Sequence, residues 1–569
     1  MSRSKHKGIL IIVRMVLVFT YFLGASCALQ TPEDELLAQE LPETDIPTKE
    51  IASPITTNSS VNNPTNTHIP PTVTEVATET PTETIISPTA TEVVTETSAN
   101  TFQINGPLRV NPDNPRYFTD NSGKAIFLTG SHTWSNFQEV GSSNPPPTTD
   151  YSTYLDFLDF NNHNFFRLWA WEQSKWAPWT SDQIWFAPSI FQRTGPGNAL
   201  DGGLKFDLTK FNQAYFDRMR SRIIEAANQG NYVSIMLFDG WSVGKKLTSD
   251  PGNPWPGHPF NSSNNINGIN GDPNKDGNGY EVHTLSIPAI TSLQEAYVRK
   301  VIDSVNDLDN VLYEISNESK QGTQETAWQY HMINFIKSYE TTKPKQHPVG
   351  MTVAYPNGSN SDLFNSPADW ISPNEDGGYK DNPPPSSGSK VIILDTDHLW
   401  GEGGDRVWLW KSFTRGYNIL YMDCYEDLYC EVYPVNDPTR LSMIANLGYA
   451  LAYADRMNLT KMNPRGDLAS TSYCLANPSS LGAEYLVYAP NGGQITINLS
   501  STPGELRVEW LNPGNGRIYQ SGTVTGGKSV SLRPPFSGDA VLYLSNRTNA
   551  VWLPLIIGNN SNQGFSGSY

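Results

Sequence analysis

The run VLYEISNE at residues 311–318 governs how the central part of this chain folds. Its first six positions carry mainly large apolar side chains, which predicts a short buried strand. Asn317 and Glu318 stand at the carboxyl end of this strand. A carboxyl group can transfer a proton and a neighbouring amide can hold a hydroxyl group, so the pair is typical of a site that acts on sugars.

Seven similar runs flank this strand, and helical patterns lie between them. The eight strand candidates span residues 125–129, 164–170, 232–238, 311–315, 349–354, 370–372, 391–394 and 418–422. Apolar residues at helical spacing occupy residues 216–224 and 293–302, the second opened by a capping box from Ser292 to Glu295, and further helices begin near Glu325, Arg406 and Thr439. Eight alternating strand and helix units predict a closed (β/α)8 TIM barrel of the α/β class, in which polar groups at the carboxyl ends of the strands meet at one face.

Glycoside hydrolysis requires a second carboxyl group across the scissile bond from the first. The apolar run at residues 391–394 is followed directly by Asp395, and Asp397 comes two residues later. In the predicted barrel Glu318 ends strand four and these aspartates end strand seven. Both aspartates are therefore candidates for the second acid. The alternative role for either one is to cap the next loop or to pair with Arg167.

Aromatic and polar side chains follow several of the predicted strands. Candidates for contacts with a substrate are Asn317, His398, Tyr355, Trp134, Trp169, Trp171, Trp241 and Trp400. Aromatic faces suit stacking on sugar rings, whereas the alternative for each tryptophan is packing in the core or at the rim of the barrel.

Two stretches near the start of the predicted barrel carry a family resemblance. Residues 116–120 read RYFTD and residues 123–130 read GKAIFLTG, which is similar to the opening of apiosidase-like catalytic domains. More broadly, the Asn-Glu pair resembles the proton-donor motif of the retaining TIM-barrel glycoside hydrolases. The resemblance spans roughly residues 106–460. It implies that Glu318 is the acid/base, that the nucleophile ends strand seven and that Arg167 lies near this nucleophile.

Strand seven departs from the apiosidase-like pattern. Where that pattern has Gly-Glu-Pro after an apolar run, this chain has DTDH at residues 395–398, and alignment of the apolar runs puts Asp397 at the glutamate position. The resemblance thus favours Asp397 over Asp395. A retaining mechanism needs the two carboxyl groups about 5.5 Å apart. Because the side chain of aspartate is one methylene shorter than that of glutamate, the backbone or the substrate must come closer to reach this separation. A wider separation would make either aspartate the general base of an inverting enzyme.

Residues 1–28 form a predicted export signal. Basic residues accompany the apolar stretch at residues 8–23, and small residues lead to Cys27. The alternatives are a signal peptide, an uncleaved anchor and a lipoprotein signal with lipid attached to Cys27. We expect an extracellular or cell-surface protein, with membrane anchoring through this segment as one option.

Residues 29–104 are rich in Thr, Pro, Glu and Ser and contain few large apolar side chains. Such a segment cannot offset its chain entropy by burial, which predicts a disordered linker. From residue 31 to residue 100, twelve acidic residues stand against Lys49 alone, so this segment supplies eleven of the eighteen excess negative charges. The folded part is only mildly acidic. This balance argues against nucleic acid as a partner, because nucleic acid binds a basic face.

Four cysteines are few for an exported chain of 569 residues, so the fold does not depend on disulfides. Cys424 and Cys430 are close enough in sequence to form one bridge. We expect no cofactor in the reaction, because no cysteine has metal-ligand spacing.

A polar insertion at residues 261–281 resembles a calcium loop in part. Asp272, Asn274 and Asp276 place oxygen atoms at every second position, but His283 occupies the position of the final glutamate. The alternatives are a structural calcium site and a loop that is held by its own turns.

The pattern changes after the predicted barrel, which we assign to residues 105–465. Short alternating strands at residues 484–489, 494–499, 506–510, 528–532 and 540–544 predict a small all-β sandwich over residues 466–547. VEWLNP at residues 508–513 and PPFSGD at residues 534–539 resemble the domain named for collagen binding that follows apiosidase-like barrels. Trp510 is expected in the core. The tail at residues 548–569 contains an apolar run that is too short to cross a bilayer.

These observations predict an extracellular glycoside hydrolase that cleaves a polysaccharide or oligosaccharide by a two-carboxylate mechanism. Two other classes fit the same residues: a non-catalytic carbohydrate- or matrix-binding surface protein on a barrel scaffold, and a polysaccharide lyase. A peptidase is disfavoured, because the chain has no His-Glu-x-x-His run, no Gly-x-Ser-x-Gly elbow and no cysteine beside a plausible base. Nothing in the sequence indicates an oligomeric state.

Overall fold

The computed structural model describes residues 103–423, 425 and 434–547, which all fall in one compact unit of the chain. The predicted export signal, nearly all of the linker, the Cys424–Cys430 pair and the C-terminal tail lie outside the described residues. Among the described residues, none of the helices has the length and apolar character needed to span a bilayer.

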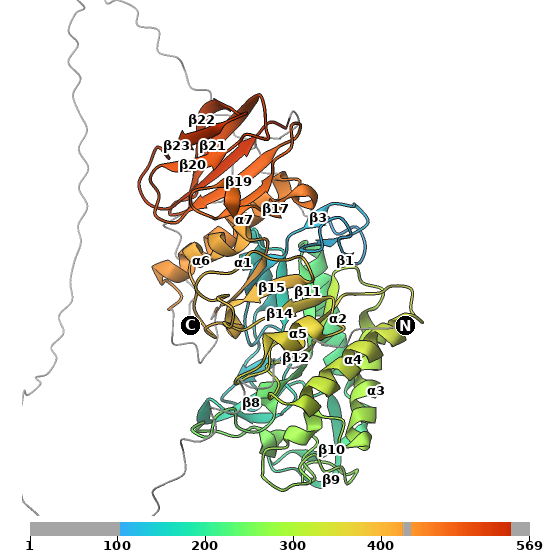
Figure 1. Ribbon diagram of the computed structural model, residues 1–569. Coiled ribbons are helices and arrows are strands. Elements are labelled where there is room, and N and C mark those ends of the chain that lie inside the picture. Colours follow the sequence, from blue (N-terminus) through green and yellow to red (C-terminus); the bar gives the residue numbers. More distant parts are fainter. Residues whose placement is uncertain (1–102, 424, 426–433, 548–569) are drawn as a thin grey trace, which may run out of the picture. The chain divides into compact units, whose positions relative to one another are not determined.

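A parallel sheet of eight strands forms the centre of the fold (Figure 1). In sheet order the strands are β4 (Thr129–His132), β16 (Asn418–Met422), β15 (Val391–Asp395), β14 (Trp370–Ser372), β13 (Val349–Thr352), β12 (Val311–Asn317), β11 (Tyr232–Asp239) and β6 (Phe165–Leu168). The N–H of Asn164 donates to the carbonyl of Thr129 at 3.0 Å across the seam between β4 and β6. Gly130 allows this approach, because a Cβ there would lie 2.2 Å from the Phe165 carbonyl oxygen. The predicted TIM barrel is confirmed.

Helices connect the barrel strands and cover their outer side (Figure 1). They are α1 (Tyr151–Phe160), α2 (Gln213–Asn228), α3 (Pro288–Val305), α4 (Thr323–Glu340), α5 (Asn360–Asn365), α6 (Arg406–Thr414) and α7 (Pro438–Arg456), with short 3₁₀ turns η1 (Gly240–Ser242), η2 (Trp255–Gly257), η3 (Tyr280–His283), η4 (Thr396–His398), η5 (Leu459–Lys461) and η6 (Gly466–Leu468). The apolar stripe of α2, which includes Met219 and Ile223, is fully buried as its spacing predicts. Asp405 caps α6 by accepting from the N–H of Trp408.

Two local predictions were wrong. The first barrel strand begins at Thr129, because the preceding apolar residues form β3 (Ala125–Ile126), which pairs antiparallel with β2 (Phe118–Thr119) in a small sheet with β1 (Arg109–Val110). Helix α3 begins at Pro288 and not at the predicted capping box, because proline fits the first turn of a helix, where no N–H partner is needed.

The segment between β6 and α2 forms strands that the periodicity did not predict. They are β7 (Lys175–Ala177), β8 (Thr180–Ala187), β9 (Phe191–Asn198) and β10 (Leu204–Phe211); β5 (Glu139–Gly141) joins β8 and β7 in one antiparallel sheet, and β9 pairs with β10. Ile184 and Phe186 on β8 are buried in a cluster with Trp169 and Trp171. This insertion therefore packs directly behind the carboxyl end of β6.

Residues 463–545 form the all-β domain that was predicted over residues 466–547, and they are shown in orange and red in Figure 1. One sheet contains β17 (Asn463–Pro464), β18 (Cys474–Asn477), β19 (Glu484–Ala489), β24 (Ala540–Ser545), β21 (Glu505–Asn512) and β22 (Arg517–Thr525), and the other contains β20 (Ile495–Asn498) and β23 (Ser529–Leu532). Trp510 is 1% exposed in the core of this domain, as expected. Cys474 is a buried free thiol. Strand β22 was not predicted, because its side chains are mostly polar and exposed.

The sandwich packs on helices α6 and α7 of the barrel. Tyr488 on β19 stacks on Trp410 of α6 with ring centroids 6.4 Å apart. Glu509, which is 1% exposed, accepts from the hydroxyl of Tyr453 at 2.7 Å and from Nη2 of Arg456 at 2.6 Å. The two domains thus share apolar and charged contacts that neither could satisfy alone.

We expect that removing the sandwich destabilises the barrel. A chain that ends at residue 465 would expose Trp410 and leave Arg456 without its carboxylate partner. Loss of one large buried contact costs about 3–5 kcal/mol, which is a sizeable part of the stability of a typical domain. Thermal unfolding and limited proteolysis of residues 103–465 and 103–547 would test this. Equal unfolding temperatures for the two chains would contradict it.

Candidate active site

Three acidic side chains predicted for the site lie at the carboxyl ends of two barrel strands. Glu318 follows β12 directly, Asp395 is the last residue of β15, and Asp397 lies in the 3₁₀ turn η4 that continues from β15. All barrel strands run parallel, so these positions share one face of the barrel. Burial raises the pKa of Glu318, and the negative charge of Asp397 raises it further. The two predicted acids therefore lie close enough for their charges to interact.

Arg167 connects the strands that carry these acids. It lies on β6 and is fully buried. Its Nε and Nη2 donate to the two carboxylate oxygens of Glu314 on β12 at 2.9 and 2.6 Å. Its Nη1 donates to Oδ2 of Asp395 at 3.0 Å and to Oδ2 of Asp397 at 3.1 Å. One guanidinium group therefore holds the ends of β12 and β15 together and supplies positive charge to three buried carboxylates.

Asp395 is held as a buried anion. Nε2 of His132, at the end of β4, donates to its Oδ1 at 3.0 Å, and the N–H of Asp397 donates to the same oxygen at 3.0 Å. Burial opposes the charge, yet the interactions with His132 and Arg167 hold the pKa of Asp395 well below its usual range. Both of its oxygens accept hydrogen bonds, which suits an anchor for the site better than an attacking group.

Asp397 has a different environment although it is only two residues away. Its side chain is 8% exposed, against 1% for Asp395. Burial and the charge of Asp395 raise the pKa of Asp397 to about 6, while Arg167 opposes this shift. Asp397 is therefore mainly ionised at neutral pH and more accessible than its neighbour.

Glu318 is placed to keep its proton. Its side chain accepts from Nε1 of Trp241 at 2.6 Å, and the residue is 6% exposed. Burial and the charge of Asp397 raise the pKa of Glu318 to about 8. The nearby Lys320 points elsewhere, because its ammonium group lies over the ring of Tyr280 at 3.9 Å from the centroid.

The amide of Asn317 is oriented by two donors. Its Oδ1 accepts from Nη2 of Arg167 at 2.7 Å and from Nε2 of His398 at 3.1 Å. The Ser372 hydroxyl donates to Nδ1 of His398 at 2.7 Å, and burial together with the charge of Arg167 lowers the pKa of His398 to about 3, so this imidazole is neutral. Asn317 Nδ2 is buried and has no hydrogen-bond acceptor within the described residues. The amide thus presents an available donor beside Glu318.

Two predicted sugar-stacking residues are packed away from any substrate. Trp169 is 1% exposed, stacks on His132 at 5.5 Å and lies 4.7 Å from the guanidinium carbon of Arg167. Trp171 is 2% exposed and packs against Phe186 at 5.0 Å. The expectation for these two residues is corrected to core packing, because the inserted strand β8 covers the end of β6.

Other predicted aromatic residues are half-buried near the acids. Tyr355 stacks on Trp241 with centroids 5.8 Å apart, and Trp241 contacts Glu318. Trp179, between β7 and β8, lies 6.3 Å from Trp241 and 5.5 Å from Trp134. Sequence analysis did not single out Trp179, because the strands that present it were not predicted. These four half-buried rings form an aromatic wall that begins at Trp241, beside Glu318.

Trp400 is also half-buried, but its ring packs edge-on against Trp408 of α6 at 5.3 Å. The ammonium group of Lys380 lies 5.6 Å from the centroid of the same ring. Trp400 therefore belongs to the loop between η4 and α6, next to the turn that carries Asp397.

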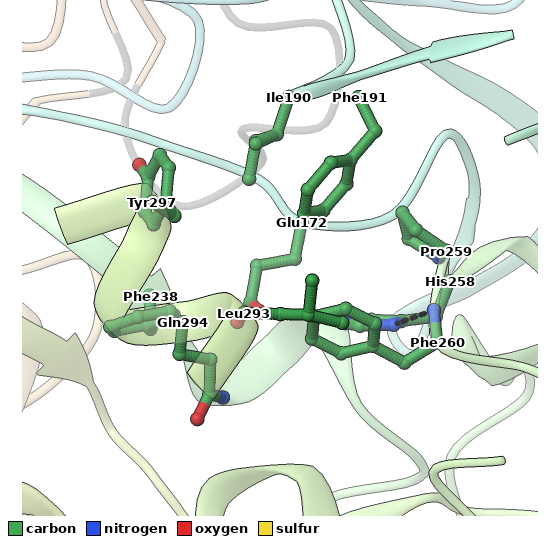
Figure 2. Close-up of a pocket in the computed structure, with 10 residues that line it drawn as sticks. All are labelled: Glu172, Ile190, Phe191, Phe238, His258, Pro259, Phe260, Leu293, Gln294 and Tyr297. Carbon is green, nitrogen blue, oxygen red and sulfur yellow. Dashed lines mark hydrogen bonds and ion pairs between the residues drawn. The ribbon is translucent and has the colours of Figure 1, made fainter. Parts of the chain in front are cut away.

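A buried polar cluster lies behind this wall. Glu172 accepts from Nε2 of His283 at 2.8 Å and from the N–H of Asp239 at 3.0 Å. Burial opposes its charge, but His283 and His258 lower the pKa of Glu172 to about 2. Figure 2 shows the residues that line a cavity here, including Glu172 and His258. The volume of this cavity is about 10 Å³. This space suits roughly one water molecule, so it is no sugar site.

The loop predicted as a calcium site is held by its own backbone. Asp272 accepts from the N–H groups of Asp276 and Gly277 at 3.1 and 3.0 Å, and Oδ1 of Asn274 accepts from the N–H of Asp276 at 2.7 Å. In the part of the chain that the structure describes, no group of three or more His, Cys, Asp or Glu residues could hold a metal ion. These bonds support the alternative of a loop closed by turns, and calcium binding stays a prediction.

Comparisons with known families match two parts of the chain. Residues 164–356, which extend from the start of β6 to just past β13, match the family described as a domain of unknown function (DUF6298). Residues 467–545 match the family described as "Putative collagen-binding domain of a collagenase", which confirms the resemblance noted for the sandwich. No curated protein sequence matches the chain.

Solved structures share the fold. A glycoside hydrolase family 5 protein from Bacteroides vulgatus ATCC 8482 has a TM-score of 0.51 and 14% identity, over 80% of this chain and 98% of that chain. Another structure, described as a glycoside hydrolase, has a TM-score of 0.50 and 13% identity, over 80% of this chain and all of the other. At such identities the likeness shows the fold alone. The chain therefore has the TIM-barrel fold found in these glycoside hydrolases, followed by a domain that matches the collagen-binding type.

Proposed function

We propose that the protein is a glycoside hydrolase in which Glu318 is the acid/base and Asp397 is the nucleophile. The observation that carries this proposal is the position of two interacting carboxyl groups at one face of the barrel, one directly after β12 and one in η4, in different environments. At neutral pH Glu318 keeps its proton and Asp397 is mainly ionised. A glycosidase needs this division between a proton donor and an anion.

The proposed reaction has two displacement steps. An oxygen of Asp397 bonds to the anomeric carbon while the glycosidic C–O bond breaks, and the proton of Glu318 passes to the departing oxygen. In the second step Glu318, now ionised, takes a proton from water. The water oxygen bonds to the anomeric carbon and the carboxylate of Asp397 leaves. The available N–H of Asn317 is the proposed donor to the hydroxyl next to the reacting carbon.

We propose a glycan substrate that stacks on the aromatic wall formed by Trp134, Trp179, Trp241 and Tyr355. A sugar ring offers a C–H face to such half-buried rings, and the wall reaches Glu318 through Trp241. The export signal expected from the sequence supports action on polysaccharide outside the cell. The narrower resemblance to apiosidase-like domains adds glycosides with terminal apiose to the substrates to be tried.

The experiment is hydrolysis of a panel of plant and microbial polysaccharides and nitrophenyl glycosides, followed by proton NMR of the first product. Release of a sugar with the starting anomeric configuration supports the double displacement, and the inverted configuration would contradict it. A product that absorbs in the ultraviolet through a new double bond would identify a lyase. Binding of a glycan without cleavage would identify a carbohydrate-binding protein.

We expect a bell-shaped dependence of kcat/KM on pH with its maximum near neutrality. Activity rises as Asp397 loses its proton, near pH 6, and falls as Glu318 loses its proton, near pH 8. Because the two groups interact, the limbs report the pair and not two isolated residues. The measurement is kcat/KM from pH 4 to pH 10 with stability checked at each pH. A flat profile across this range would contradict the assignment.

A further inference from the structure

The segment after β11 makes two contacts with Glu318. Nε1 of Trp241 donates to the carboxyl group at 2.6 Å, as described above. Nζ of Lys246 donates to the backbone carbonyl of Glu318 at 2.5 Å. Side chain and backbone of the proposed acid are thus both held by residues 240–250, a segment that lies outside the acid-bearing strands.

The backbone of Glu318 needs such support. Its φ angle is 44°, in the left-handed region that a residue with a Cβ adopts only at an energetic cost. Gly240 packs against the same carbonyl, since a Cβ at this position would lie 2.2 Å from the Glu318 oxygen and 2.5 Å from Nζ of Lys246. The lack of a side chain at residue 240 therefore leaves room for the ammonium group to reach the carbonyl.

Lys246 is itself held in place by acids. The N–H groups of Lys246 and Leu247 donate to Oδ2 of Asp250 at 2.7 and 2.8 Å, which closes the loop. Burial lowers the pKa of Lys246 to about 8, while the charges of Asp239, Glu318 and Asp250 oppose this shift and Lys320 adds to it. Asp239 ends β11 and its Oδ1 accepts from the N–H of Trp241, so the same acid supports both contacts to Glu318.

We propose that Lys246 is a positioning residue that holds the backbone of Glu318 in its left-handed conformation and thereby directs the carboxyl group toward the substrate. This inference rests on the proposed role of Glu318. The ammonium group does not contact the reacting bond. Its hydrogen bond to the carbonyl of Glu318 fixes the backbone at this residue, and the backbone conformation sets the direction of the Glu318 side chain.

The test compares Lys246→Met with Lys246→Arg. Methionine keeps the apolar stem but removes the donor, and kcat should fall roughly 10- to 100-fold with little change in KM, as expected for a displaced catalytic group. The basic limb of the pH profile should move to higher pH, because a positive charge near Glu318 is lost. Arginine retains charge and donors and should restore much of kcat. Lys245→Met is the matched control, because Nζ of Lys245 donates to the Asp250 carbonyl and not to Glu318.

A crystal structure of the Lys246→Met variant gives a readout that does not depend on hydrolysis. The expected result is a Glu318 backbone that leaves the left-handed region. Without Lys246, the buried Asp239 would lack the positive charge that faces it. The double variant Asp239→Asn/Lys246→Met removes this acid as well, and it keeps the test valid if the single variant unfolds. Unchanged kcat in an active enzyme together with an unchanged Glu318 backbone would overturn the proposal. Absence of hydrolysis by the wild-type chain would instead overturn the proposed function.

Discussion

We expect Glu318→Gln to reduce strongly the hydrolysis of glycosides with poor leaving groups while the chain stays folded. The amide keeps the size of the side chain and can still accept from Nε1 of Trp241, but it has no acidic proton to give. Loss of general acid catalysis typically costs about 10²- to 10⁴-fold in rate. Glycosides with dinitrophenyl leaving groups need little protonation, so their first step should be less affected. The measurement is kcat for a series of aryl glycosides against the pKa of the leaving phenol.

The matched control for this substitution is Glu375→Gln. Glu375 follows β14, and its side chain is 59% exposed and paired with Lys380. Its loss should leave both activity and unfolding temperature unchanged, because exposed ion pairs contribute little. Added azide should restore activity of a Glu318→Ala variant by attacking the glycosyl-enzyme without help from a base. Full activity of Glu318→Gln on a poor leaving group would remove Glu318 from the mechanism.

Asp397→Asn and Asp395→Asn should separate catalysis from stability. For Asp397→Asn we expect kcat to fall by roughly 10⁴-fold or more, as for loss of a nucleophile, with a small change in unfolding temperature. Asp395→Asn removes the anion that accepts from His132 and Arg167 inside the barrel. Breaking such a buried pair typically costs about 3–5 kcal/mol, so this variant should unfold at a clearly lower temperature.

Covalent labelling decides between the two aspartates directly. A fluorinated glycoside with a good leaving group should trap a glycosyl ester, and mass spectrometry of peptides that cover residues 391–405 should locate it on Asp397. Thermal unfolding of both variants provides the second measurement. A label on Asp395, together with normal stability of Asp395→Asn, would reverse the roles that we assign to the two residues.

The barrel could be predicted from the sequence because its signal is local. Apolar runs such as Val311 to Ile315 and Val391 to Leu394 report burial on both faces of a parallel strand, and they need no knowledge of their neighbours. The position of Glu318 and Asp397 at strand ends then placed both acids at one face, because parallel strands in a barrel end together. Local periodicity was less informative for two kinds of antiparallel strand: β7 has only three residues, and β22 carries mostly exposed polar side chains.

The roles of individual side chains depended on contacts between distant parts of the chain. Trp169 and Trp241 look alike in sequence, yet an inserted sheet buries the first and leaves the second beside Glu318. Asp395 and Asp397 are two residues apart and both accept from Arg167, but only Asp395 also accepts from His132, and its side chain is the more deeply buried of the two.

The sequence by itself determined the architecture: an eightfold alternation of strands and helices, a β-domain after it, and acids at the ends of strands four and seven. Tertiary structure alone decided which acid has the higher pKa, which tryptophans stay partly exposed and which lysine contacts the backbone of Glu318. The physical reason is the distance along the chain between the groups that interact. Strand and helix patterns arise from neighbours along the chain, whereas burial, charge compensation and pKa arise from groups that folding brings together from 70 to 260 residues away.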